Sequence, residues 1–211
     1  MGAADPRNVA AQLGKYTGHA DLMQDAKASG LSRRALLGAF AATAVMAAPS
    51  YTKAAGFLRG AGDIRKISMF SGRLGERIDM IYWLEGDYIP EAVAEISRFY
   101  RDWRTGDVKQ IDTRTLDIMA AAHRMMDISE PYQLLSGYRS PKTNAMLRSK
   151  SRNVARNSLH MKAQAADLRL ATRSVSQMAR AAAACRAGGV GRYSGSNFVH
   201  MDCGPVRSWG S

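Results

Sequence analysis

The stretch "NSLHMKAQAADLRL", from Asn157 to Leu170, decides how the second half of the chain folds. Its last residues alternate, so a β-strand here places on opposite faces the sets Ala165, Asp167, Arg169 and Ala166, Leu168, Leu170. A carboxylate in so apolar a strand is costly unless a basic partner, hydrogen bonds or a metal neutralises it. His160, one of only four histidines, precedes Asp167 by seven residues.

A second alternating stretch, "FVHMDC", lies near the end of the chain and puts Phe198, His200 and Asp202 on one face. If the two strands are neighbours, Asp167 and His200 meet and His160 folds in from the preceding loop. Two imidazoles and one carboxylate suit a catalytic zinc site, which keeps its fourth position for water. From these residues alone, three separately satisfied polar side chains remain the alternative.

The other elements follow from apolar spacing and from turn residues. The pattern predicts a hairpin (66–70 with 78–83), helices over 90–106, 113–126, 142–149 and 174–187, a strand within 131–136, and two final strands within 189–203. The order of these elements predicts an α+β fold with a mostly antiparallel central sheet and flanking helices. His123 falls on a helix face, where a packed residue is the expected role.

Composition bounds the class of protein. The chain has 211 residues, enough for one ordinary domain plus an appendage, and its 46% hydrophobic content suits a packed core. The net charge of +12 favours a polyanionic partner, although a solvated basic surface explains it equally well. No arginine-rich stripe interleaved with aromatic residues is present, which argues against nucleic acid as the partner.

The first part of the chain has the features of an export signal. "SRRALLG", at 32–38, begins an uncharged run from Ala35 to Ala48, too short for a transmembrane helix of about 20 residues. Its Ser-Arg-Arg-x-Leu-Leu pattern resembles a twin-arginine signal, which implies a translocase as partner and a periplasmic location. An uncleaved leader would anchor the protein to the membrane. The alternative is a buried alanine-rich helix.

These features divide the chain into a leader (1–54), a linker (55–65) and a domain (66–211). Beyond the leader, 24 basic residues face 15 acidic ones, so the domain and linker remain strongly basic. Both cysteines, Cys185 and Cys203, fall within the domain. In an oxidising compartment they could form a disulfide worth roughly 3 kcal/mol, or stay as two buried thiols.

Four ordered motifs carry a resemblance to a known superfamily. "SLHMKAQAADLRL" resembles the S-x-H-x-x-G-x-A-x-D signature of the zinc D-alanyl-D-alanine carboxypeptidases and murein endopeptidases, which share a hedgehog-like fold. "GYRSPKTN", "GGVGRY" and "FVHMDCG…RSW" resemble the branch of murein endopeptidases with an H-x-D ending. The resemblance covers 66–209. It implies a zinc peptidase that acts on stem or cross-link peptides of peptidoglycan, with endopeptidase action expected over D,D-carboxypeptidase action.

Carried over by position, the resemblance makes His160, Asp167 and His200 the ligands of one zinc ion. Arg139 matches an arginine that faces the substrate carbonyl or carboxylate, where a guanidinium can stabilise an oxyanion. The alternative role for Arg139 is a surface salt bridge. Ser158 matches the serine that orients the metal ligands.

Two departures from the pattern put parts of this site in question. Ala163 replaces the motif glycine and adds a methyl group near His160. Asn197 and Phe198 occupy the positions where relatives carry the general base, and neither can act as one. Asp202 is the nearest carboxylate and is our candidate for the base; the alternative is that it holds a ligand in place. A non-catalytic zinc-containing module that binds the cell wall is the rival function.

Overall fold

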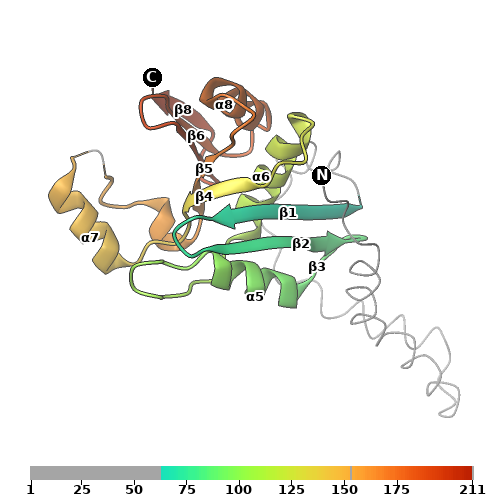
Figure 1. Ribbon diagram of the computed structural model, residues 1–211, viewed down its shortest axis with the longest axis horizontal. Coiled ribbons are helices and arrows are strands. Elements are labelled where there is room, and N and C mark those ends of the chain that lie inside the picture. The colour runs from blue at the N-terminus through green and yellow to red at the C-terminus, as the bar shows by residue number, and fades with distance from the viewer. Residues whose placement is uncertain (1–62, 153, 211) are drawn as a thin grey trace, which may run out of the picture. The chain divides into compact units, whose positions relative to one another are not determined.

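The computed structural model describes residues 63–152 and 154–210, which belong to one compact unit, 52–211. An eight-stranded mixed sheet forms its centre, in the order β3-β2-β1-β4-β5-β7-β6-β8 (Figure 1). All neighbouring strands pair antiparallel except β1 with β4 and β6 with β8. The strands are β1 (Ile64–Ser71), β2 (Glu76–Leu84), β3 (Asp87–Tyr88), β4 (Tyr132–Ser136), β5 (Ala165–Arg169), β6 (Gly189–Tyr193), β7 (Phe198–Asp202) and β8 (Arg207–Gly210).

Four α-helices complete the described part of the chain, so the predicted α+β class is confirmed. They are α5 (Pro90–Phe99), α6 (Thr113–Met125), α7 (Pro141–Lys150) and α8 (Val175–Ala184), with a short 3-10 helix, η2 (Leu159–Lys162), before β5. Local chemistry fixes their starts: Pro90 opens α5, Ser140 caps α7, and Ser174 forms a capping box with Gln177 at α8. Among the described residues no helix is both long and apolar enough to cross a membrane.

The hydrophobic core lies on one face of the sheet. In β5, Ala166 and Leu168 are fully buried in the cluster that also contains the apolar residues of α5, α6 and α8. In β7, Val199 and Met201 join the same cluster. Because side chains alternate along a strand, the residues between them project from the opposite face, which α6 and α8 do not cover. The candidate site lies on that face.

Three predictions about the elements need correction. The helix expected to reach 106 ends at Phe99, because the chain turns around Asp102, whose carboxylate accepts hydrogen bonds from the backbone N–H of Arg104 and of Ser140. β3 and β8 were not expected, since strands of two and four residues are too short to show alternation. The first strand of the hairpin begins at Ile64, two residues before its expected start at Lys66.

Cys185 and Cys203 are both buried free thiols, so the structure has the second of the two alternatives rather than the disulfide. The sulfur of Cys185, at the end of α8, lies 3.4 Å from the carbonyl oxygen of Ala181. Burial raises the pKa of each thiol to about 11. The leader at 1–54, with its Arg33 and Arg34, lies outside the described residues.

Candidate metal centre

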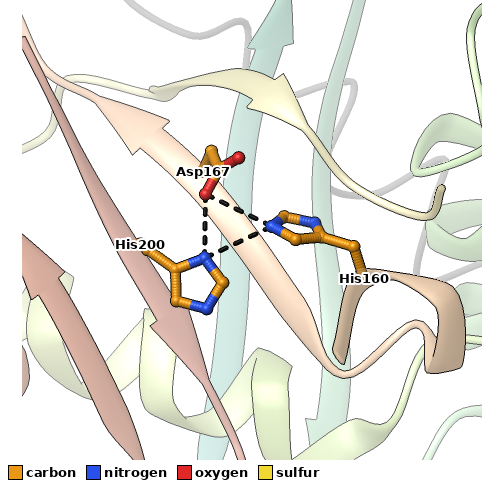
Figure 2. A group of neighbouring side chains, drawn as sticks. All are labelled: His160, Asp167 and His200. Atoms are coloured by element: carbon orange, nitrogen blue, oxygen red, sulfur yellow. Dashed lines mark hydrogen bonds and ion pairs between the residues drawn. The ribbon is translucent and has the colours of Figure 1, made fainter. Parts of the chain in front are cut away.

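Strand pairing brings two of the predicted ligands together. β5 and β7 are antiparallel neighbours, and Asp167 is the register partner of His200. His160 reaches the same point from η2, so the three side chains point toward one another (Figure 2). The condition under which Asp167 and His200 can meet, that their strands are neighbours, therefore holds in the structure.

The three ligand atoms form a compact triangle. Nδ1 of His200 lies 2.9 Å from Oδ1 of Asp167, and Nε2 of His160 lies 3.3 Å from the same oxygen. The two ring nitrogens are 3.2 Å apart. A tetrahedral zinc ion with bonds of about 2.0–2.1 Å separates its ligand atoms by roughly 3.3 Å. The triangle matches that size.

The outer hydrogen bonds of the two imidazoles fix which nitrogens face the centre without a proton. Nδ1 of His160 lies 2.7 Å from the carbonyl oxygen of Gly137, which can only accept, so Nδ1 carries the proton. Nε2 of His200 lies 3.0 Å from Oδ2 of Asp202 and donates to it. When both rings are neutral, two lone pairs and one carboxylate oxygen therefore converge with no hydrogen between them. Such a donor set fits a cation.

Without a cation, a proton takes its place. Burial alone would lower the pKa of His200, but hydrogen bonds to Asp167 and Asp202 outweigh it and raise the pKa to about 9. Burial lowers the pKa of His160, which stays neutral. Burial would raise the pKa of Asp167, yet the two histidines hold it far below its usual range. One protonated histidine and one carboxylate are the metal-free state of this cluster.

The turn that carries His160 is held at both ends. The Oγ of Ser158 accepts a hydrogen bond of 3.3 Å from the backbone N–H of His160, which caps η2. Ala163 ends η2 in the left-handed conformation, with φ 54° and ψ 36°, and is fully buried. A glycine adopts this conformation without strain, so the departure from the motif costs backbone energy but leaves the turn intact.

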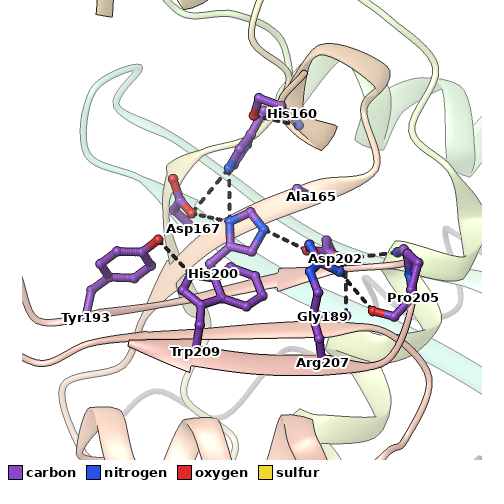
Figure 3. Close-up of polar contacts among 12 residues, drawn as sticks. His160, Ala165, Asp167, Gly189, Tyr193, His200, Asp202, Pro205, Arg207 and Trp209 are labelled. Atoms are coloured by element: carbon purple, nitrogen blue, oxygen red, sulfur yellow. Dashed lines mark hydrogen bonds and ion pairs between the residues drawn. The ribbon is translucent and has the colours of Figure 1, made fainter. Parts of the chain in front are cut away.

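Asp202 is enclosed by donors (Figure 3). Besides His200, its oxygens accept from both terminal nitrogens of Arg207, at 3.0 and 2.7 Å, and from the backbone N–H of Gly189 and Gly204. The side chain is 0% exposed. Burial would raise the pKa of Asp202, but the hydrogen bonds from His200 and Arg207 hold it well below its usual range. This environment favours the alternative role, in which Asp202 holds the ring of His200.

Arg139 lies beside the cluster rather than in a surface salt bridge. Its side chain is 12% exposed, and its Nη2 is 3.6 Å from Oδ2 of Asp167. The backbone N–H of Arg139 donates to the carbonyl oxygen of His160, which joins the two loops. Its buried Nε has no hydrogen-bond partner among the described residues. Burial lowers the pKa of Arg139, although it remains a strong base.

The three candidate ligands open into a cleft of about 490 Å³, lined by Arg139, Ser158, Tyr193 and Trp209 among others. The ring of Trp209 lies 5.3 Å from that of His200, and its Nε1 donates to the hydroxyl of Tyr193 (Figure 3). Gly191 allows the indole of Trp209 to lie this close to the sheet, because a Cβ at Gly191 would be 2.7 Å from the indole ring.

Three contributors to the site were missed from the sequence. The carbonyl of Gly137 is a backbone acceptor, which no side-chain pattern reveals. Arg207 and Trp209 belong to the quoted "RSW" motif, but neither was given a role. Arg207 and Trp209 reach the site only because β8 pairs in parallel with β6. A strand of four residues is too short for this pairing to be predicted from the sequence.

Comparison with known proteins identifies relatives that span most of this domain. The family model for peptidoglycan L,D-endopeptidase MepK matches residues 59–209. The chain is 42% identical over 135 residues to the peptidoglycan L,D-endopeptidase MepK of Escherichia coli (strain K12), covering 64% of this chain and 74% of that protein. It is 36% identical over 136 residues to the probable MepK of Haemophilus influenzae, covering 64% and 73% respectively.

Proposed function

The chain belongs to the peptidoglycan L,D-endopeptidase MepK family, and from this membership we infer that it is a metallopeptidase that cleaves cross-links in peptidoglycan. The relatives are named L,D-endopeptidases, and we extend that bond preference to this chain. The single observation that carries metal dependence is the convergence of His160, Asp167 and His200, whose facing atoms all lie within 4.8 Å of one another.

Zinc is the ion that best suits this donor set. Two imidazole nitrogens and one carboxylate oxygen are a common set of three protein ligands in catalytic zinc sites. When bound, zinc polarises a carbonyl and lowers the pKa of water toward about 7. The three candidate ligands line the cleft, so an ion held by them would be accessible to substrate.

The chain's own residues supply orientation and charge. Arg139 carries a positive charge into the cleft next to Asp167, where its guanidinium can donate to the peptide carbonyl as negative charge develops there. Ser158 fixes the turn that holds His160. For Asp202 we favour a positioning role, because its burial and its several donors leave it little capacity to accept a proton.

Location is part of the same proposal. The twin-arginine pattern at Arg33 and Arg34 supports export by the twin-arginine translocase into the periplasm, where peptidoglycan lies. The basic domain suits an anionic wall. Replacing both arginines by lysine should keep a tagged protein out of the periplasmic fraction.

Purified, zinc-loaded protein should cleave cross-linked muropeptides, and a chelator should stop the reaction. Product masses identify the bond: an L,D-endopeptidase converts a cross-linked dimer into two peptides at one defined position. The rival, a non-catalytic wall-binding module, predicts retention of zinc and binding to peptidoglycan with no new products. That result would overturn the proposal.

A further inference from the structure

We propose that a second, basic cleft beside the metal centre binds a carboxylate of the peptide substrate. It rests on the proposed function and concerns how the substrate is held. The cleft, of about 810 Å³, is called here the basic cleft, and the residues that matter in it are Phe70, Arg77, Gln133, Arg169, Arg173 and Asn197.

The basic cleft is built on a row of residues that crosses four adjacent strands. Arg77 of β2 is the register partner of Phe70 in β1, Phe70 of Gln133 in β4, and Gln133 of Arg169 in β5. Register partners project from the same face of a sheet. The row therefore lies on one face, with an arginine at each end and an amide and an aromatic ring between them.

This row runs alongside the metal centre. Arg169 and Asp167 are two residues apart on β5, so they share a face and their Cα atoms are about 7 Å apart. An extended peptide advances by the same distance over two residues. A substrate whose scissile bond lies at the metal centre and which continues along β5 would place a group about two residues away beside Arg169, at the near end of the basic cleft.

Arg169 is oriented in advance for an anion. Its Nε donates to the carbonyl oxygen of Asn197 at 2.6 Å and its Nη2 to that of Ser196 at 3.0 Å. These two bonds hold the guanidinium plane against the β6–β7 turn. Its Nη1 has no hydrogen-bond partner within residues 63–152 and 154–210, and a planar guanidinium suits a carboxylate.

The charges of the basic cleft are not balanced from within. Arg77, Arg169 and Arg173 form no ion pair with a carboxylate in the described part of the chain. Glu130 also lines the cleft, but its oxygens accept from the backbone of Ala171 and Thr172 and from the hydroxyl of Thr172. Three arginines against one engaged glutamate leave a net positive cleft.

A carboxylate is the ligand that this chemistry fits. Peptidoglycan peptides carry carboxylates on side chains and at chain ends, near the bonds that join two stems. Phe70 and Gln133 offer an apolar surface and an amide on which the peptide between the bond and the carboxylate can lie. The basic cleft then selects substrates with a negative charge about two residues from the scissile bond.

The test compares two cross-linked muropeptides that differ only in amidation of the carboxylates near the cross-link. Wild-type protein should have a lower KM for the acid form, by about tenfold, with similar kcat. Arg169→Gln should raise KM for the acid form about fivefold, remove most of the preference over the amide form, and retain zinc. Arg169 is the variant of choice because it lies at the end of the row nearest the metal centre, two residues from Asp167.

Arg180→Gln is the matched control, since it removes the same charge from an exposed site on α8. Binding of an uncleaved stem peptide, followed by calorimetry, gives a readout independent of turnover: Arg169→Gln should weaken the binding and Arg180→Gln should not. Equal affinities for acid and amide forms, or equal effects of the two variants, would overturn the carboxylate site. Failure of wild-type protein to cleave either substrate would instead overturn the proposed function.

Discussion

The Nε2 of His160 lies 3.2 Å from the Nδ1 of His200, although neither nitrogen carries a proton when both rings are neutral. Two lone pairs at this distance repel unless a cation or a proton lies between them. The outer hydrogen bonds, to a backbone carbonyl and to a carboxylate, impose this arrangement. The site is therefore prepared for a metal by groups that never touch it.

Replacing His160 or Asp167 by alanine should abolish zinc retention and peptidase activity together, because two remaining ligands bind zinc weakly. Metal content after dialysis and muropeptide cleavage are the measurements. His123→Gln is the control, since His123 contacts the carbonyl of Glu130 and lies outside the cluster. Full zinc occupancy in Asp167→Ala would contradict the assigned ligands.

The metal-free protein should lose stability as pH rises from about 6.5 to 9. The pKa of His200 is raised to about 9 in the fold, so its contribution is complete below the unfolded value near 6.5 and disappears through the folded value. The expected loss in the free energy of unfolding is on the order of 2 kcal/mol. Urea titrations at several pH values measure it, and His200→Gln should flatten the slope.

Asp202→Asn separates the two roles considered for Asp202. A positioning role predicts zinc affinity reduced about 10- to 100-fold, with most activity restored at saturating zinc and an unchanged pH profile. Arg207→Gln should have a weaker effect of the same kind, because Arg207 acts through Asp202. Loss of turnover by more than about 100-fold at saturating zinc, with loss of the acidic limb, would restore Asp202 as the general base.

Ala163→Gly should be neutral or stabilising by up to about 1 kcal/mol, because relief of the left-handed backbone offsets the added chain entropy and the lost methyl group. Ala163→Val should cost more than about 2 kcal/mol, since a β-branched residue is strained at positive φ. Urea unfolding measures both. Ala182→Gly, within α8, is the control and should be destabilising by about 1 kcal/mol. Opposite effects of the two alanine-to-glycine changes would show that the backbone conformation decides whether stability rises or falls.

The thiols of Cys185 and Cys203 should react slowly with a disulfide reagent in the native protein and quickly after unfolding, with two thiols counted without reductant. Burial and the raised pKa, about 11 for each, account for the slow reaction. A count of zero in protein isolated from the periplasm would show that the two cysteines are joined there.

Two of the three candidate ligands could be placed from the sequence because they lie on alternating strands, although each strand has only five residues. Alternation in β5 and β7 places Asp167 and His200 on matching faces, and antiparallel pairing makes them register partners. Arg207 could not be assigned a role, since it reaches Asp202 only through the pairing of β8 with β6. The early end of α5 was also hidden, because Asp102 bonds to Ser140, 38 residues away.

The sequence pattern does not distinguish between a general base and a positioning group at Asp202. Sequence places Asp202 on the face of His200, which suits both roles equally. Only the donors around it, two of them backbone N–H groups, distinguish them. These donors surround Asp202 only when the neighbouring loops fold as they do, and local sequence preferences do not determine the conformation of those loops.

One face of the sheet carries α5, α6 and α8, while the metal centre opens from the other. A peptide bridge in a wall has no loose end: each side continues into a stem bound to a polymer strand. Such a bridge cannot be threaded into a tunnel or a blind pocket. It can, however, be laid from the side across the face of the sheet opposite α5, α6 and α8. The one-sided placement of the helices thus lets the enzyme work within a continuous mesh, cutting in the middle of a network that offers no terminus to grasp.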